Sequence, residues 1–165
     1  MKKLLVSLLV VFMVFSLAAC GNNGSTNAGD NVEGELATLI TDLYAGISQD
    51  DLPMLGQMPV EDAEMFAWVL GAEEGFTLDG VKEAYVSEPM ISAIAHTVLL
   101  VRMEAGADVE TAKAAIKENV NPRKWICVGV EDEKNVIVDS RGDLIVLIME
   151  NNHAQTIHEN FKNLK

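Results

Sequence analysis

The run Asp-Leu-Ile-Val-Leu-Ile-Met at residues 143–149 decides the fold. Its consecutive apolar residues make both faces of an extended chain apolar, which is typical of a strand inside a sheet. Residues 140–142, Ser-Arg-Gly, suit a tight turn that leads back to a partner strand at 135–139. We expect 143–149 to lie inside the sheet, with helix 109–120 or the last helix across one face. The N-terminal helices or a partner should cover the other face.

Further strands are predicted upstream of this hairpin. Residues 96–103 alternate between two faces, and residues 125–131 form an apolar run after Pro122. Residues 81–87, closed by Pro89, are expected to form an edge strand. The segment before them that contains Gly56 and Pro59 is expected to be a loop.

Four amphipathic segments predict helices. They run from Glu33 to Ile47, from Glu61 to Leu70, from Val109 to Val120 after an Asp108 cap, and across the C-terminus. The expected buried positions are Leu36, Leu39, Ile40, Leu43, Tyr44 and Ile47; Ala63, Phe66, Ala67 and Leu70; Val109, Ala112, Ile116 and Val120; and Ala154, Ile157, Phe161 and Leu164.

This order predicts an α+β domain. Its antiparallel sheet should have about four to five strands, with the helices grouped on one face. A strand pair followed by a helix occurs at 81–120 and again at 125–164, after an N-terminal helical pair. A duplicated ββα unit is therefore one interpretation, although without residue identity it is a repeat of topology only.

The first nineteen residues predict a signal peptide. Lys2 and Lys3 precede an apolar run at 4–15, which is too short for a transmembrane helix. Residues 17–21, Leu-Ala-Ala-Cys-Gly, resemble the lipobox of bacterial lipoproteins, in which the cysteine sulfur receives a diacylglyceryl group and cleavage occurs just before the cysteine. We therefore expect Cys20 to be the lipidated mature N-terminus, which anchors the protein to the outer face of the cell membrane.

Residues 20–32 are expected to be a flexible tether and residues 33–165 a single α+β domain. The eleven residues 21–31 include no large apolar side chain. Their r.m.s. reach is roughly 18 Å by the random-coil relation for Gly-rich chains. The domain should therefore stay close to the membrane without packing on it.

The charge argues against two classes of partner. The chain has 12 Lys and Arg against 25 Asp and Glu, for a net charge of −13, and Lys2 and Lys3 leave with the signal. Such a chain repels nucleic acids and anionic lipid headgroups. The remaining interpretations are solubility outside the cell, or an acidic face for a basic partner or a cation.

Cys127 and the three histidines are candidate reactive groups. With Cys20 lipidated, Cys127 has no disulfide partner, and its apolar neighbours predict a buried, unreactive thiol. His153 and His158 are five residues apart, which turns them about 140° from each other on a helix. A shared metal is not expected there, and His96 is expected to be half-buried and hydrogen-bonded.

No other motif indicates a metal or a cofactor. Residues 131–133, Glu-Asp-Glu, are expected to form a solvated loop. Neither they nor residues 139–143 have the spacing of oxygen ligands that a calcium-binding loop requires. Residues 141–143, Arg-Gly-Asp, match a cell-adhesion tripeptide, but they also suit a hairpin turn. Core packing is the favoured role, and lining an apolar groove the alternative, for Trp68, Trp125, Met54, Met58 and Met65.

The chain resembles the bacterial lipoproteins grouped as "domain of unknown function 4358". The resemblance rests on the lipobox, the first helix from 35 to 47, the runs 86–90 and 122–128, and the start of the final strand at 142–145. It covers most of residues 35–165. It implies a small α+β domain on the cell surface and carries over no activity and no catalytic residues.

Two function classes stay open. No nucleophile elbow, P-loop or dinucleotide-binding pattern is present in the sequence, which favours a membrane-tethered, non-enzymatic binding or accessory module. The alternative is an extracytoplasmic enzyme whose site is assembled from residues distant in sequence. A deep pocket where His96 or Cys127 meets a carboxylate would favour the enzyme. An exposed apolar patch would favour binding.

Overall fold

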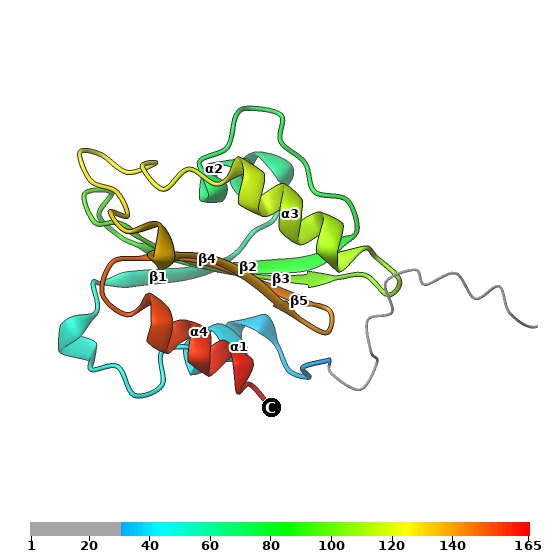
Figure 1. The fold of residues 1–165 in the computed structure, drawn as a ribbon, viewed down its shortest axis with the longest axis horizontal. Helices are drawn as coiled ribbons and strands as arrows, with labels where there is room; N and C mark the ends of the chain where they lie inside the picture. Colours follow the sequence, from blue (N-terminus) through cyan, green and yellow to red (C-terminus); the bar gives the residue numbers. More distant parts are fainter. Residues whose placement is uncertain (1–30) are drawn as a thin grey trace, which may run out of the picture.

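A five-stranded antiparallel sheet lies between two layers of helices in the computed structural model, which describes residues 31–165 (Figure 1). The predicted signal peptide, Cys20 and most of the predicted tether lie outside the described residues. The strands follow the spatial order β1-β2-β3-β5-β4, which confirms the α+β class and the expected size of the sheet. They are β1 Leu55–Pro59, β2 Val81–Pro89, β3 His96–Met103, β4 Val136–Arg141 and β5 Leu144–Glu150.

Helices cover both faces of the sheet, as expected for the strand at 143–149, whereas the expectation that the helices group on one face is wrong. Figure 1 shows α2 and α3 on one side and α1 and α4 on the other. The chain order strand pair then helix does recur, as β2-β3-α3 and β4-β5-α4, but these two helices cover opposite faces. The helices are α1 Leu36–Asp42, α2 Ala63–Leu70, α3 Val109–Asn119 and α4 Ala154–Lys162, and two short 3-10 turns are η2 Gln49–Asp51 and η3 Glu133–Asn135.

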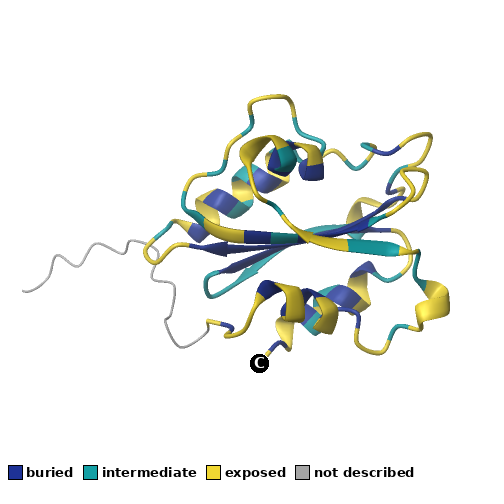
Figure 2. Ribbon diagram, turned by 180° about the vertical axis from the view of Figure 1, so that it is seen from behind, coloured by how far each residue is buried: buried dark blue, intermediate teal, exposed yellow. Residues whose placement is uncertain are grey.

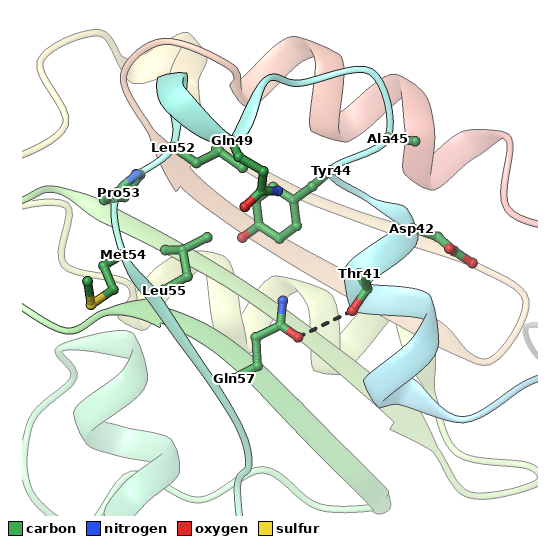
Figure 3. Close-up of a pocket in the computed structure, with 10 residues that line it drawn as sticks. All are labelled: Thr41, Asp42, Tyr44, Ala45, Gln49, Leu52, Pro53, Met54, Leu55 and Gln57. Atoms are coloured by element: carbon green, nitrogen blue, oxygen red, sulfur yellow. Dashed lines mark hydrogen bonds between the residues drawn. The ribbon is translucent and has the colours of Figure 1, made fainter.

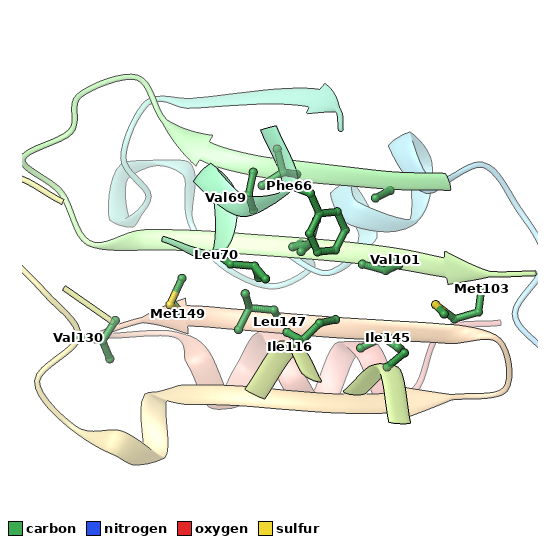
Figure 4. Close-up of a cluster of buried hydrophobic side chains, with 14 of the residues drawn as sticks. Phe66, Val69, Leu70, Val101, Met103, Ile116, Val130, Ile145, Leu147 and Met149 are labelled. Carbon is green, nitrogen blue, oxygen red and sulfur yellow. The ribbon is translucent and has the colours of Figure 1, made fainter. Parts of the chain in front are cut away.

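Strand β5 explains why two helical layers are needed. It is buried along its whole length, and Ile145, Leu147 and Met149 pack with α2 and α3 in the core shown in Figure 4. Burial of each such side chain contributes roughly 1.5–3 kcal/mol. The prediction of an interior strand covered on both faces is confirmed. The side chains that pack on the other face, with α1 and α4, are Leu144, Val146 and Ile148.

The helix starts follow the capping residues of the sequence. The Asp62 carboxylate accepts a hydrogen bond from the Met65 amide (2.7 Å), and Asp108 accepts one from the Thr111 amide (3.0 Å). Such caps satisfy amides that lack a partner in the first turn. The predicted Asp108 cap is confirmed. The helix expected at 33–47 is shorter, because α1 gives way to turns after Asp42.

Strand β1 forms where the sequence predicts a loop. It pairs with β2 from Leu55 opposite Pro89 to Pro59 opposite Tyr85. Pro59 is tolerated because it ends a strand at the edge of the sheet, where a missing N–H disrupts little. The expectation that 81–87 is an edge strand is therefore wrong: β2 is interior and continues to Pro89.

The strand predicted at 125–131 is wrong as well. The Val130 amide donates to the Pro122 carbonyl (2.8 Å), which closes residues 122–130 into a loop, called here the 122–130 loop. Cys127 has a φ of 62°, a left-handed conformation that an extended strand cannot contain. Cys127 is also exposed, so the prediction of a buried thiol is corrected.

The two ends of the sheet differ. At one end Arg102 donates to the carbonyls of Val32 and Gly34, both at 2.8 Å. Val32 is buried, so the domain begins before the predicted end of the tether at residue 32. The opposite end, called here the loop end, carries the β2–β3 connection at 90–95 and the 122–130 loop (Figures 1 and 2). None of the helices between residues 31 and 165 is long and apolar enough to cross a bilayer.

Candidate functional site

Large apolar side chains are exposed together at the loop end. Two hydrogen bonds join the segments that carry them: the Met90 amide donates to the Met54 carbonyl, and the Ile126 amide donates to the Ser92 carbonyl, each at 2.9 Å. Apolar side chains gathered on a surface mark interaction sites more often than scattered ones do. The group, called here the loop-end surface, consists of Met54, Trp68, Met90, Ile91, Ile94, Ile126 and Val128.

A pocket of about 310 Å³ opens beside this surface and is called here the tryptophan pocket. Trp68, on α2, forms one wall and is 60% exposed, whereas Trp125, from the 122–130 loop, is buried. The pocket therefore joins α2 and both loops of the loop end. Its lining also includes Glu88, Ser92, Asn121 and Lys124.

A buried ion pair contributes to the lining of this pocket. The Lys124 Nζ lies 2.6 Å from Oε1 of Glu88 and donates to the Val69 carbonyl at 2.7 Å. The Thr97 hydroxyl donates to the same Glu88 oxygen at 2.5 Å. The ammonium also lies 4.9 Å and 5.4 Å from the ring centres of the two tryptophans, within the range of cation–π attraction.

Burial shifts the protonation equilibria of both partners in this pair. Burial raises the pKa of Glu88, and the charge and hydrogen bond of Lys124 oppose that rise. Burial lowers the pKa of Lys124, and Glu88 opposes that fall. Since each charge offsets the other, the pair adds no net charge to the pocket, and its hydrogen bonds connect the 122–130 loop to β2 and α2.

His96 lies on the opposite face of the sheet, sealed from solvent. Its Nε2 lies 2.8 Å from the Tyr44 hydroxyl, its Nδ1 has no hydrogen-bond partner within residues 31–165, and it is only 1% exposed. Desolvation lowers the pKa of His96 to about 4, so the ring is neutral at pH 7. The expectation of a half-buried, fully hydrogen-bonded histidine is corrected to a buried one bonded at one nitrogen.

No carboxylate is hydrogen-bonded to His96 in the described chain. Glu150 faces it in the β3–β5 register, but the Glu150 carboxylate accepts hydrogen bonds from the backbone amides of Asn152 and His153. Cys127 is exposed on its loop and, together with Glu131, lines a cavity of about 520 Å³. Neither His96 nor Cys127 is hydrogen-bonded to a carboxylate among residues 31–165.

A second hollow, of about 770 Å³, lies between α1, η2 and β1 (Figure 3). The Thr41 hydroxyl donates to Oε1 of Gln57 at 3.3 Å across it, and Tyr44 contributes to its wall. Its only other ionisable lining residue is Asp42, so no acid–base pair faces this hollow. Met54 lines it and also belongs to the loop-end surface.

The remaining motif residues have local roles. His158 Nε2 lies 2.7 Å from Asp139 Oδ2, whereas His153 precedes α4 as its N-cap residue. Burial raises the pKa of Asp139, but the hydrogen bonds from His158 and the Ser140 amide outweigh burial and hold it below its usual range. No group of three or more potential metal ligands occurs among residues 31–165.

The adhesion-like tripeptide forms the β4–β5 turn. Arg141 donates to the carbonyls of Lys162 and Leu164, and Asp143 lies 3.3 Å from Arg102. Gly142 has a φ of 57°, as a tight hairpin turn requires. Both charged side chains of the tripeptide are therefore engaged within the domain.

The tryptophans and methionines divide between the two expected roles. Trp125 and Met65 pack on the core with α2 and α3, as expected. Core packing is wrong for Trp68, Met54 and Met58, which are exposed. Glu88 and Lys124 are not among the site residues predicted from the sequence. The available signal was an acid on β2 in register with the buried Ala84 and Val86, a position where alternation predicts an apolar side chain.

No family model matches this chain, and no curated protein or solved structure matches it. The candidate site is therefore defined by its own geometry, as an exposed apolar surface beside a small pocket with a neutralised ion pair.

Proposed function

We propose that the chain is a lipoprotein anchored through Cys20 to the outer face of the cell membrane, and that its domain is a non-enzymatic module that binds a partner protein through the loop-end surface. The exposed apolar side chains gathered at the loop end carry this proposal. The resemblance to the "domain of unknown function 4358" lipoproteins is part of the proposal. It rests on the lipobox and the run 122–128.

The chemistry of the described residues supports binding over catalysis. A reactive cysteine or histidine needs a partner that tunes its protonation and a site that substrate can reach. His96 is buried against Tyr44, where a substrate cannot reach it, and the accessible Cys127 has no hydrogen-bonded base among residues 31–165. Apolar side chains such as Ile91 and Ile126, 61% and 64% exposed, lose unfavourable contact with water when a partner covers them.

The position of the loop end favours an outward-facing site. Arg102 holds Val32 and Gly34 at the other end of the sheet, which is where a chain from Cys20 joins the domain. The nine residues of β2 span about 30 Å at the usual rise per residue of a strand. That length exceeds the roughly 18 Å reach expected for the tether. The loop-end surface is thereby presented to proteins outside the membrane.

Cell fractionation tests the anchor. Cys20→Ala should appear in the medium or stay an unprocessed precursor, because no sulfur is left for lipid attachment. Cys127→Ala is the matched control and should stay in the membrane fraction. A processed Cys20→Ala product that remains bound to the membrane would contradict the anchor.

Site-specific photo-crosslinking on intact cells tests the binding surface. A photoreactive amino acid at Ile91, in the loop-end surface, should give a discrete crosslinked protein band. The same amino acid at Lys82, exposed at the other end of β2, is the control and should not give that band. Equal products from both positions, or no protein product from Ile91, would overturn the proposed function.

A further inference from the structure

We infer that the segment bound at the loop-end surface is a basic peptide stretch of the partner, with one apolar or aromatic side chain seated in the tryptophan pocket. This inference rests on the proposed function and adds the chemistry of the partner to it.

The size and lining of the tryptophan pocket favour a side chain as its occupant. Its volume of about 310 Å³ is at the lower limit of the roughly 300–1,000 Å³ typical of small-molecule sites. The exposed indole of Trp68 offers a flat apolar face, and such aromatic side chains commonly dominate binding energy. The Lys124–Glu88 pair is already neutralised, so it does not select for a charged occupant.

Polar groups surround this apolar wall. Ser92 and Asn121 line the pocket and supply polar atoms that a peptide backbone can bond. Beyond Trp125 a second cavity, of about 520 Å³, continues along the 122–130 loop as far as Glu131. Trp125 lines both cavities, so an occupant of the tryptophan pocket lies next to space for flanking residues.

The charges around the site favour a basic partner. Glu64 precedes Trp68 by one turn of α2, and Glu73 and Glu74 directly follow the pocket residue Ala72. Glu131 lines the second cavity, where Arg123 is the other charged lining residue. All four carboxylates are exposed, and none has an ion-pair partner among residues 31–165. Uncompensated acids at the rim of an interface attract lysine and arginine and repel acidic partners.

The same charges disfavour a lipid bilayer as the occupant. Anionic headgroups attract clusters of lysine and arginine. Lys124 is neutralised by Glu88, and residues 131–133, Glu-Asp-Glu, follow the 122–130 loop with their side chains exposed. Arg123 on the 122–130 loop and Lys134 directly after the acids are exposed cations, and two cations against the three acids at 131–133 leave the region negative.

Defined peptides test the inference with the full lipidated protein in nanodiscs of neutral phospholipid. The probe is a fluorescent heptapeptide, Lys-Ser-Lys-Trp-Lys-Ser-Lys, measured by anisotropy. Two controls replace the central Trp with Ala, or every Lys with Glu. We expect the probe to bind about tenfold or more tightly than either control, with affinity falling as salt rises.

Two variants separate the pocket from the charged rim. Trp68→Ala should abolish the preference for Trp over Ala. Glu73→Gln combined with Glu74→Gln should reduce only the preference for Lys over Glu. Met58→Ala, an exposed methionine outside the loop-end surface, is the control and should change neither preference. Equal binding of the Lys and Glu peptides, or of the Trp and Ala peptides, would overturn the inference.

The bilayer and the proposed function each have a separate readout. Quenching of tryptophan fluorescence by brominated acyl chains in the nanodisc, lost in Trp68→Phe, would place the surface in the membrane and overturn the inference. If Ile91 crosslinks to a protein on cells but the peptides show no preference, the proposed function stands and the basic-peptide inference fails. If Ile91 yields no protein crosslink, the proposed function fails whatever the peptides show.

Discussion

Lys124 and Glu88 form an ion pair of 2.6 Å in which the two side chains are only 7% and 6% exposed. Lys124 belongs to the 122–130 loop and Glu88 to β2, so the pair fastens the loop that carries Trp125 to the sheet. Both tryptophans of the pocket lie against the same ammonium. The shape of the candidate binding site therefore depends on this pair.

Replacing only Lys124 should lower the free energy of unfolding more than replacing both Lys124 and Glu88. Lys124→Met leaves the Glu88 carboxylate buried without its counter-ion and should lower the free energy of unfolding by about 3–5 kcal/mol. The double variant Lys124→Met with Glu88→Leu should recover part of that loss, because no unpaired charge remains. Urea unfolding measures both. A double variant less stable than Lys124→Met alone would contradict this expectation, because Glu88 would then stabilise the fold even without its counter-ion.

His96 should make the domain less stable in mild acid. Its pKa is depressed to about 4 in the fold, against about 6.5 when exposed. Between these values the unfolded chain binds a proton that the folded chain does not, so stability falls as pH drops from 6.5 to 4. The loss approaches about 3 kcal/mol at the lower limit.

An NMR titration of the His96 ring and unfolding curves at several pH values measure this effect. His96→Gln removes the titrating group and should flatten the dependence of stability on pH across the same window. A His96 ring that titrates near pH 6.5 in the folded protein would contradict its burial against Tyr44.

Leu147 tests the core beneath α2 and α3. Its side chain is fully buried, so Leu147→Asp places a charge there without a partner and should unfold the domain. The neighbouring change Ile145→Val removes one methylene and should cost about 0.5–1.5 kcal/mol. Circular dichroism and thermal unfolding distinguish the two outcomes, and a Leu147→Asp variant of wild-type stability would contradict the packing described for β5.

Cys127 should react quickly in the native protein. In a Cys20→Ser background it is the only thiol, and it lies exposed on the 122–130 loop. A bulky maleimide should label it at a similar rate with and without denaturant. Protection that disappears only in denaturant would mean that the thiol is buried, contrary to the structure.

The sequence predicts those parts of the fold that depend on local pattern. The apolar run of β5 requires cover on both faces, and Asp108 caps its helix through neighbouring backbone amides. Prediction from the sequence is wrong where a segment's backbone hydrogen bonds go to residues that are distant in the chain. The apolar run around Cys127 resembles a strand, but its Ile126 amide bonds to Ser92 and the chain closes into a loop. Gly56 similarly suggested a loop until pairing with β2 placed it in β1.

The candidate site could be predicted from the sequence less well than the fold. Trp68 is exposed although its neighbours Ala67 and Val69 on α2 are buried. Its exposure depends on how that helix packs on the sheet, which the local sequence does not specify. Glu88 and Lys124 are 36 residues apart, and nothing local to either one indicates the other. The alternation of β2 did mark Glu88 as an acid on a buried face, which is the one sign that a counter-ion was needed.

Thiol protection on intact cells tests the central claim, that a partner protein covers the loop-end surface. In a Cys127→Ser background, Ile91→Cys should react readily with maleimide in the purified protein and be protected on intact cells. Lys82→Cys, at the other end of β2, should react at comparable rates in both settings and corrects for access through the cell envelope. Equal relative labelling of the two positions on cells and in purified protein would contradict the claim.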